Sequence, residues 1–174
     1  MSSAALVNSG IRFLVLLLLQ IFLLRQISWG WGERDYLFVF LYPLFIALLP
    51  LRMTRGLVIL LGFAFGLLLD LFYETLGLHA AALTFTAFLR GPLLRILEPR
   101  DGYGVKAAPV AADVNRTWLL RYLAFLFLGH CIFFFSVQAF SFVFLQDILL
   151  RTLFTFLASY TVAVLVMLIF DPRS

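Results

Sequence analysis

Long apolar runs separated by short polar breaks dominate the chain. A helix needs about 20 mostly apolar residues to cross a bilayer core that is about 30 Å thick, and strands are much shorter than these runs. We predict transmembrane helices at residues 8–27, 36–51, 56–73, 76–97, 118–138 and 148–170. A polar loop at 98–117 separates the fourth run from the fifth, and residues 1–174 are expected to form a single transmembrane domain.

The composition places these runs in lipid. Hydrophobic residues make up 64% of the chain and charged residues 13%, whereas a soluble domain has about 25% charged residues. A soluble chain this apolar could not cover its surface with polar groups. We therefore expect an all-α integral membrane protein, folded as a compact bundle of about six transmembrane helices.

Two runs leave the number of crossings open. The second is short and contains Pro43, whose missing N–H is tolerated in a membrane when a neighbouring helix covers the gap. The fourth is interrupted by Arg90 and by the pair Gly91-Pro92, which predicts a kink. Five crossings, or a re-entrant fourth segment, are the alternatives. The first run has no small-residue cleavage site after Arg25, so we expect it to be retained and not removed as a signal peptide.

The basic residues predict the orientation. With six crossings, both termini and the second and fourth connections lie on one side of the membrane. That side holds ten of the 13 basic residues: Arg12, Arg52, Arg55, Arg90, Arg95, Arg100, Lys106, Arg116, Arg121 and Arg173. Basic residues in short loops resist translocation, so we predict that both termini are cytoplasmic. A chain with five crossings would lose this charge asymmetry.

A face of small residues on the third predicted helix ends in a carboxylate. Gly62, Gly66 and Asp70 are spaced four residues apart and therefore share one helix face, and Gly77 and His79 open the next helix. Glycines on such a face allow another backbone to approach closely. Asp70 would cost about 2.5–3.5 kcal/mol at the middle of a membrane helix, so it needs a partner. We favour hydrogen bonds that fix the hairpin, including one to His79; contact with a partner helix, or proton or ion transport, are the alternatives.

Other polar side chains within the runs are interpreted as interhelical hydrogen-bonding groups. They include two glutamines, one histidine and a polar stripe with spacings of three and four residues in the last run. These residues are Gln20, Gln138 and His130, and Thr152, Thr155 and Ser159 of the stripe.

No motif in the sequence indicates catalysis, a cofactor or nucleic-acid binding. Cys131 is the only cysteine, and no spacing of histidines and cysteines matches a metal site, so we expect no metal and no cofactor. Phosphate-binding loops, nucleophile elbows and paired carboxylates within one run are also missing, so we expect no enzyme. The basic residues around the long loop are expected to contact anionic lipid headgroups. These are Arg90, Arg95, Arg100, Arg116 and Arg121.

The third and fourth runs carry a distinctive pattern of residues. It consists of Gly66-Leu67-Leu68-Leu69-Asp70, then Thr75-Leu76-Gly77-Leu78-His79-Ala80-Ala81-Ala82, and then Phe88-Leu89-Arg90-Gly91-Pro92. This pattern resembles the MreD family of bacterial rod shape-determining proteins. The rest of the chain is similar in plan, with Gln20 in a leucine-rich first run and a basic loop that begins at Pro99-Arg100.

The resemblance implies a non-catalytic scaffold of the cell-wall elongation machinery in the bacterial cytoplasmic membrane. Its implied partners are the coiled-coil protein MreC and, less directly, the actin-like protein MreB, a RodA-type glycosyltransferase and a class B penicillin-binding transpeptidase. The MreD family is also similar in fold to the substrate-binding subunits of energy-coupling-factor transporters. The resemblance supplies no catalytic residue. In this interpretation a groove between helices receives the transmembrane helix of the MreC-like partner.

Two other functions are kept as alternatives. A vitamin-type transporter subunit would use Asp70, His79 or Gln20 to hold a ligand in a pocket near the outer face. An intramembrane enzyme or lipid flippase would depend on Asp70 for turnover, but the same apolar run contains no second carboxylate.

Overall fold

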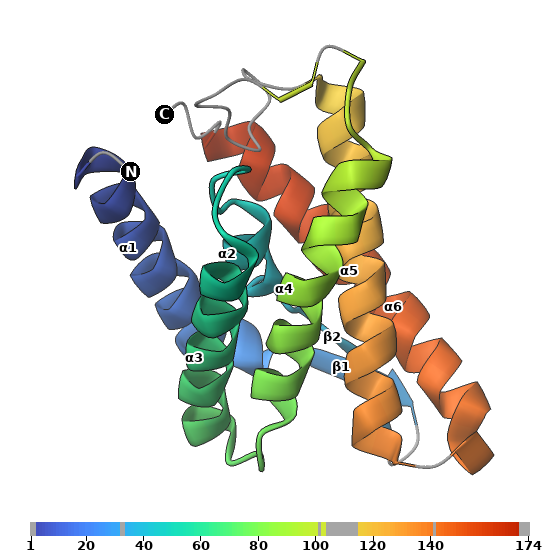
Figure 1. The fold of residues 1–174 in the computed structure, drawn as a ribbon. Helices are drawn as coiled ribbons and strands as arrows, with labels where there is room; N and C mark the ends of the chain where they lie inside the picture. The colour runs from blue at the N-terminus through green and yellow to red at the C-terminus, as the bar shows by residue number, and fades with distance from the viewer. Residues whose placement is uncertain (1–2, 32–33, 101, 104–114, 141, 171–174) are drawn as a thin grey trace.

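Residues 3–31, 34–100, 102–103, 115–140 and 142–170 are described in a computed structural model of the chain. Most of this length is helical, as expected, and the helices form one bundle (Figure 1). Most of the predicted loop 98–117 lies outside the described residues. The start of the first helix, the end of the last helix, the end of the fourth helix and the start of the fifth all lie at the same end of the bundle (Figure 1).

The first run is helical throughout, but its geometry changes near its end. It begins as α1 (Ser3–Leu18), continues as a π-helical turn, η1 (Leu19–Leu23), and ends as a 3-10 turn, η2 (Leu24–Gln26). π-helical turns inside α-helices are rare and occur mostly as single turns at functional positions. Gln20 lies in this turn and is only 1% exposed.

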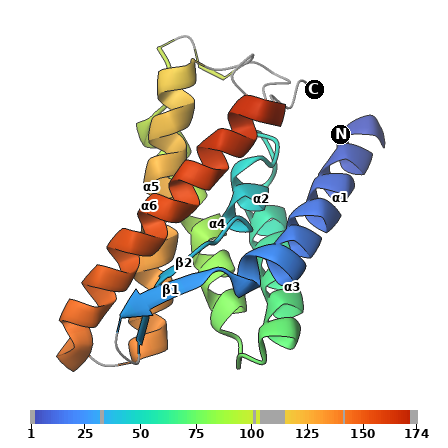
Figure 2. The same cartoon turned by 180° about the vertical axis from the view of Figure 1, so that it is seen from behind.

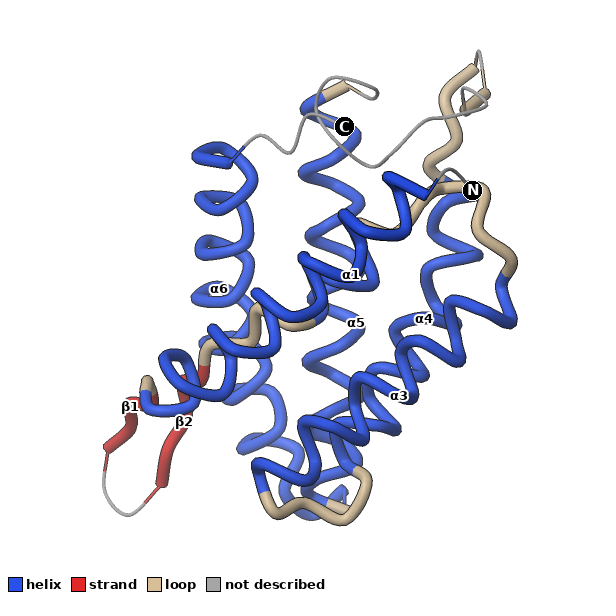
Figure 3. Tube along the Cα trace, turned by 90° about the vertical axis from the view of Figure 1, so that its left-hand side faces the viewer, coloured by secondary structure: helices blue, strands red, loops and turns tan. Residues whose placement is uncertain are grey.

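A short β-hairpin follows, which the sequence did not predict and which adds two strands to a fold that is mainly helical, as expected. Its strands are β1 (Ser28–Trp31) and β2 (Arg34–Phe38), and they pair antiparallel with Ser28 opposite Phe38. Aromatic residues favour strands, and this stretch is rich in tryptophan, tyrosine and phenylalanine. The hairpin lies at the end of the bundle opposite the termini and packs along the last helix (Figure 3).

The prediction of a continuous second helix at 36–51 is wrong. β2 takes up the first residues of this run, residues 39–41 have no regular structure, and α2 (Pro43–Ala47) is a single short helix. A helix through this point would bring the Pro43 ring against the carbonyl of residue 39, whereas proline is accepted in a first helical turn, where it lies here. The run is nevertheless almost entirely buried from Val39 to Leu49. It therefore passes through the interior of the bundle as an interrupted segment, which we define as residues 39–50.

The next two runs form the predicted helical hairpin. α3 (Arg55–Tyr73) and α4 (Leu78–Ile96) lie antiparallel and side by side (Figures 1 and 3). α4 continues through Arg90 and Pro92 to Ile96, so the interruption that suggested a re-entrant segment does not end the helix. The fourth apolar run thus forms one helix of 19 residues.

The last two runs are long helices joined by a short 3-10 turn. They are α5 (Arg116–Ala139) and α6 (Leu145–Phe170), with η3 (Phe142–Phe144) between them. α5 packs between α4 and α6, and α6 lies across the back of the bundle over the β-hairpin (Figure 2). Within the described residues, three helices are long and apolar enough to cross a membrane: α3, α5 and α6. The protein is therefore a membrane protein of mainly helical structure.

Candidate functional site

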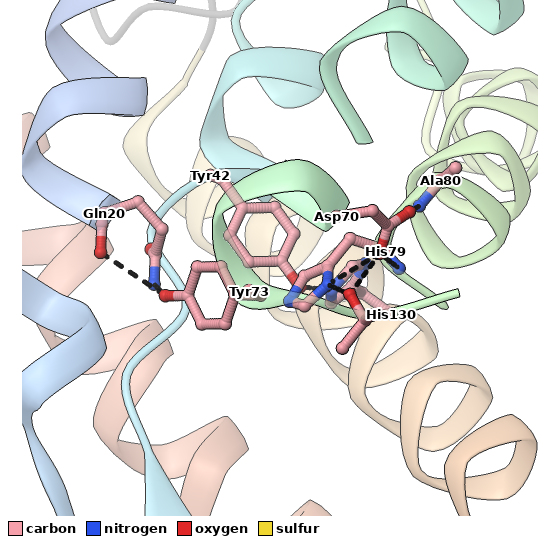
Figure 4. A network of polar contacts seen from close by, with 8 residues as sticks. Gln20, Tyr42, Asp70, Tyr73, His79, Ala80 and His130 are labelled. Carbon is pink, nitrogen blue, oxygen red and sulfur yellow. Dashed lines mark hydrogen bonds and ion pairs between the residues drawn. The ribbon is translucent and has the colours of Figure 1, made fainter. Parts of the chain in front are cut away.

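Asp70, near the end of α3, caps the beginning of α4. Its carboxylate accepts the backbone N–H groups of His79 and Ala80, each at 2.9 Å, and it also accepts the hydroxyl of Thr75 (Figure 4). His79 and Ala80 are the second and third residues of α4, whose N–H groups have no partner within the helix. The charge also lies at the positive end of the α4 dipole. These contacts are those expected if Asp70 fixes the hairpin.

The N-cap residue of α4 provides no side-chain hydrogen bond to the start of that helix. Glu74 ends α3 in the left-handed region, with φ 56°, and Gly77 occupies the N-cap position of α4 with φ 83°. Gly77 favours this backbone conformation but has no side chain with which to cap the helix. Asp70, from the previous helix, therefore supplies the cap that the local sequence lacks.

The glycine face of α3 is a packing surface inside the chain. A Cβ atom on Gly66 would lie 2.3 Å from the Ala80 Cα atom, and one on Gly62 would lie 2.9 Å from the Leu83 carbonyl oxygen. The backbones of α3 and α4 therefore touch along this face. The sequence left open whether these glycines pack within the chain or bind a partner, and their contacts are with α4. A partner helix has no access to this face in the folded chain.

His79 extends the Asp70 contacts into the core. Its Nδ1 lies 3.1 Å from the Asp70 carboxylate and 3.0 Å from the Thr75 hydroxyl, and its ring packs on Tyr73 with centroids 4.6 Å apart. The side chain is 2% exposed, and its Nε2 has no hydrogen-bond partner among the described residues. Tyr73 in turn accepts a hydrogen bond of 3.0 Å from the Gln20 amide. Polar contacts thus join η1 to α3 through Gln20 and Tyr73 and join α3 to α4 through Asp70 and His79, and the ring contact between Tyr73 and His79 connects the two groups (Figure 4).

His130 of α5 forms a second buried polar group beside this network. Its Nε2 lies 2.9 Å from the Tyr42 hydroxyl and its Nδ1 lies 2.8 Å from the Thr86 hydroxyl. Thr86 donates its own hydrogen to the Ala82 carbonyl, so its oxygen is the acceptor for a proton on Nδ1. This is the interhelical hydrogen bonding expected for a lone histidine in a membrane helix.

Side chains of two distant helices satisfy the backbone of the interrupted segment. Gln20 accepts the Leu41 N–H at 2.8 Å and donates to the Val39 carbonyl at 3.0 Å. Ser159 of α6 accepts the Phe40 N–H at 2.8 Å, and Thr155 accepts the Phe38 N–H at 3.1 Å. A backbone without helical hydrogen bonds is tolerated at membrane depth only when protein covers it in this way. Two residues of the predicted polar stripe, Thr155 and Ser159, therefore bind backbone and not another helix, whereas the Thr152 hydroxyl has no hydrogen-bond partner among the described residues.

Arg90 binds backbone carbonyl groups at the C-terminal end of the interrupted segment. It is 3% exposed and donates to the carbonyl oxygens of Leu49 and Pro50 and, at 3.2 Å, to the Tyr122 hydroxyl. These carbonyls follow the end of α2, and the Pro50 carbonyl also accepts the Met53 N–H at 3.1 Å. The guanidinium of Arg90 is therefore buried and bonded to backbone, and does not lie free at the surface as the prediction of contact with lipid headgroups assumed.

The remaining basic residues of that group lie at the surface. Arg95, Arg100, Arg116 and Arg121 are all exposed; Arg95 lies in the last turn of α4, Arg100 follows that helix, and Arg116 and Arg121 lie in the first turns of α5. Their contact with anionic lipid stays a prediction. Among the described residues, no group of three histidine, cysteine or acidic side chains is arranged to hold a metal ion.

Sequence reasoning missed the backbone partners at the site. Thr75, Ala80 and the segment 39–41 carry no marked side-chain signal, yet they supply or receive most of the hydrogen bonds described above. A signal was nevertheless present for the interrupted segment, since Pro43 and Pro50 bracket a stretch too short for a full crossing helix.

The comparisons with known proteins give no relative. No family model matches the sequence, and neither a characterised protein nor a solved structure matches it. The resemblance to the MreD family therefore rests on the hairpin pattern and on the plan of the chain.

Proposed function

We propose that the protein is a non-catalytic membrane scaffold of the bacterial cell-wall elongation machinery, acting as MreD-type proteins do through an MreC-like partner. The observation that supports this most is the use of the polar residues in the membrane-embedded part. Asp70, Gln20 and Arg90 all bond to backbone of their own chain. Intramembrane polar groups usually mark a ligand or ion path, whereas these three side chains bind backbone groups and stabilise the fold.

In the topology that we propose, the chain crosses the membrane six times, and the interrupted segment is the second crossing. Its support is the placement of both termini at one end of the bundle and the ten-to-three division of basic residues between the two sides. Single-cysteine labelling tests this topology. Ser174→Cys and Gly102→Cys should react only from the cytoplasmic side and Glu74→Cys only from the outside, each in a Cys131→Ser background. Labelling of residues 102 and 174 from opposite sides would refute six crossings.

We place the partner on the outward face of α3. Because Gly62 and Gly66 pack against α4, a partner helix must use the opposite face, which carries exposed residues at spacings of three and four. These are Leu57, Leu60, Ala64, Leu67 and Leu71. Ala64 is a small residue at the middle of this stripe, where helices can approach closely.

The decisive experiment combines cell shape with partner capture. Cells depleted of the protein should become round, and the protein should co-purify with the MreC-like partner. Ala64→Phe should abolish capture without loss of folding, because lipid accepts the larger side chain, whereas Thr161→Phe on the exposed face of α6 should leave capture unchanged. Unchanged cell shape on depletion would refute the function. Normal capture with Ala64→Phe would refute only the assigned face.

A substrate-binding subunit of a vitamin-type transporter is the second candidate. The observation that favours it is the buried Nε2 of His79, which has no hydrogen-bond partner among the described residues and could meet a polar atom of a ligand. Native mass spectrometry of the purified protein tests this. A small molecule that co-purifies with the wild type and is lost from His79→Phe would support transport over scaffolding.

A further inference from the structure

A cavity of about 240 Å³ opens between the turn before α3 and the last turns of α4. Tyr103 also lines it, and its hydroxyl donates to the Leu94 carbonyl at 2.7 Å. At about 30 Å³ for each water, the volume would hold about eight water molecules, which is the size of a small polar group and not of a drug-sized ligand. Both helix ends lie at the end of the bundle that holds the chain termini (Figure 1).

Three arginines and one glutamate line this cavity. Arg55, Arg90 and Arg95 come from the start of α3 and from α4, and Glu98 follows α4. The lining therefore carries a net positive charge, which predicts an anionic occupant. Arg55 is held in place because its guanidinium lies 4.2 Å from the centre of the Phe88 ring.

Arg90 is the most buried of these three arginines, and one of its nitrogens takes no part in its bonds to the chain. Arg90 is 97% buried, given its 3% exposure, and uses Nε and Nη2 to bind the Tyr122 hydroxyl and two carbonyls. None of these three bonds uses its Nη1. The backbone bonds fix the guanidinium in one orientation, so this donor is preorganised.

The N-terminus of α3 adds donors at the same place. Thr54 occupies the N-cap position without a side-chain cap, and the first turn of α3 contains no acidic residue. Uncapped N–H groups and the positive end of a 19-residue helix favour a negative charge, and phosphate is the usual anion bound in such positions. Arg55 and Val58, from the first turn of this helix, both line the cavity.

We propose that this cavity binds a phosphate group, with Arg55 and Arg95 as its outer ligands and Arg90 at its base. The phosphate can belong to the headgroup of an anionic phospholipid or to a soluble phosphate compound. This proposal does not depend on the scaffold function. In a specific site, Arg55 should strengthen phosphate binding and Glu98 should weaken it, whereas diffuse attraction of lipid would depend equally on all exposed arginines.

Native mass spectrometry of the full chain in a neutral detergent tests the proposal. The protein is mixed with equal amounts of phosphatidylglycerol and phosphatidylcholine, and the retained lipid is counted. Wild type should retain phosphatidylglycerol selectively. Arg55→Gln and Arg95→Gln should each weaken retention about tenfold, as expected for loss of one charged hydrogen bond. Arg116→Gln, an exposed arginine outside the cavity, is the matched control and should leave retention unchanged.

Glu98→Gln gives a result of opposite sign. Removal of the acidic side chain from the lining should strengthen retention, whereas a purely structural cavity predicts no change. Equal losses with Arg55→Gln and Arg116→Gln, or no selective retention by the wild type, would overturn the proposal. Added inorganic phosphate separates the two sources: displacement of the lipid indicates a soluble phosphate compound, and continued retention indicates a lipid headgroup.

Discussion

The Asp70 carboxylate of α3 accepts the backbone N–H of His79 in α4 at 2.9 Å, so one helix caps another across a tight turn. The same carboxylate accepts the N–H of Ala80 through its second oxygen. A charge in the membrane is thereby used to satisfy two donors that the turn itself cannot satisfy. Asp70 consequently fixes the start of α4 against the end of α3, in addition to the close packing along Gly62 and Gly66.

Asp70→Asn should destabilise the protein by about 1–3 kcal/mol, because the amide can accept only one of the two N–H groups and leaves the other buried. The midpoint of thermal unfolding in detergent measures this, at about 2–4 °C for each kcal/mol. Asp35→Asn, at an exposed position of the β-hairpin, is the control and should change the midpoint little. Equal midpoints for the wild type and Asp70→Asn would contradict the capping role.

Gly66→Ala should prevent close packing of the hairpin. The new Cβ would lie 2.3 Å from a backbone atom of Ala80, which cannot move without displacing α4, and overpacking of this kind costs about 1–3 kcal/mol or more. Folded yield and unfolding midpoint are the measurements. Gly56→Ala meets no atom within 4 Å and should be neutral or slightly stabilising, because alanine favours helix. Similar behaviour of the two variants would show that α3 and α4 are not in backbone contact.

Ser159→Ala should release the interrupted segment from α6. The Phe40 N–H would lose its acceptor, at a cost of about 1–3 kcal/mol, and its amide should exchange with solvent deuterium faster than in the wild type. Hydrogen exchange followed by mass spectrometry of the 39–42 peptide measures this. Thr161→Ala, on the exposed side of the same helix, serves as the control. Unaltered exchange in Ser159→Ala would mean that the segment is held by other contacts.

Arg90→Met should destabilise the end of α2 while keeping the length of the side chain. The buried Leu49 carbonyl would lose its donor, whereas the Pro50 carbonyl would keep the Met53 N–H, so we expect a loss of about 1–3 kcal/mol. Arg121→Met removes an exposed arginine and should have a small effect on the unfolding midpoint. If the two substitutions lower the midpoint equally, Arg90 acts through its charge and not through these hydrogen bonds.

The sequence predicted the last four helices best. α3, α4, α5 and α6 all lie within three residues of their predicted limits, and the Gly91-Pro92 pair does not end α4. The second run failed because hydropathy reports burial and not backbone conformation. Its residues are as buried as expected, but Pro43 prevents a continuous helix, and the partners that make an irregular backbone tolerable lie in other runs.

The roles of individual side chains were predictable only where the partner is nearby in sequence. Asp70 and His79 are nine residues apart, and their contact followed from the shortness of the turn. Arg90 and Leu49 are 41 residues apart, and nothing in the pattern of either run connects them. A charged residue in a basic region was therefore assigned to lipid, although its fixed partners are carbonyl groups of the chain.

Phe38 and Phe40 donate their N–H groups to side chains that are synthesised 117 and 119 residues later. Before α6 exists, these donors would have no acceptor in a hydrocarbon environment, at a cost of several kcal/mol. The interrupted segment therefore has to stay at the membrane surface or in the insertion machinery until the helices that follow it have been inserted. Biogenesis of this protein would then end not with its last helix but with the return of residues 39–42 to the interior.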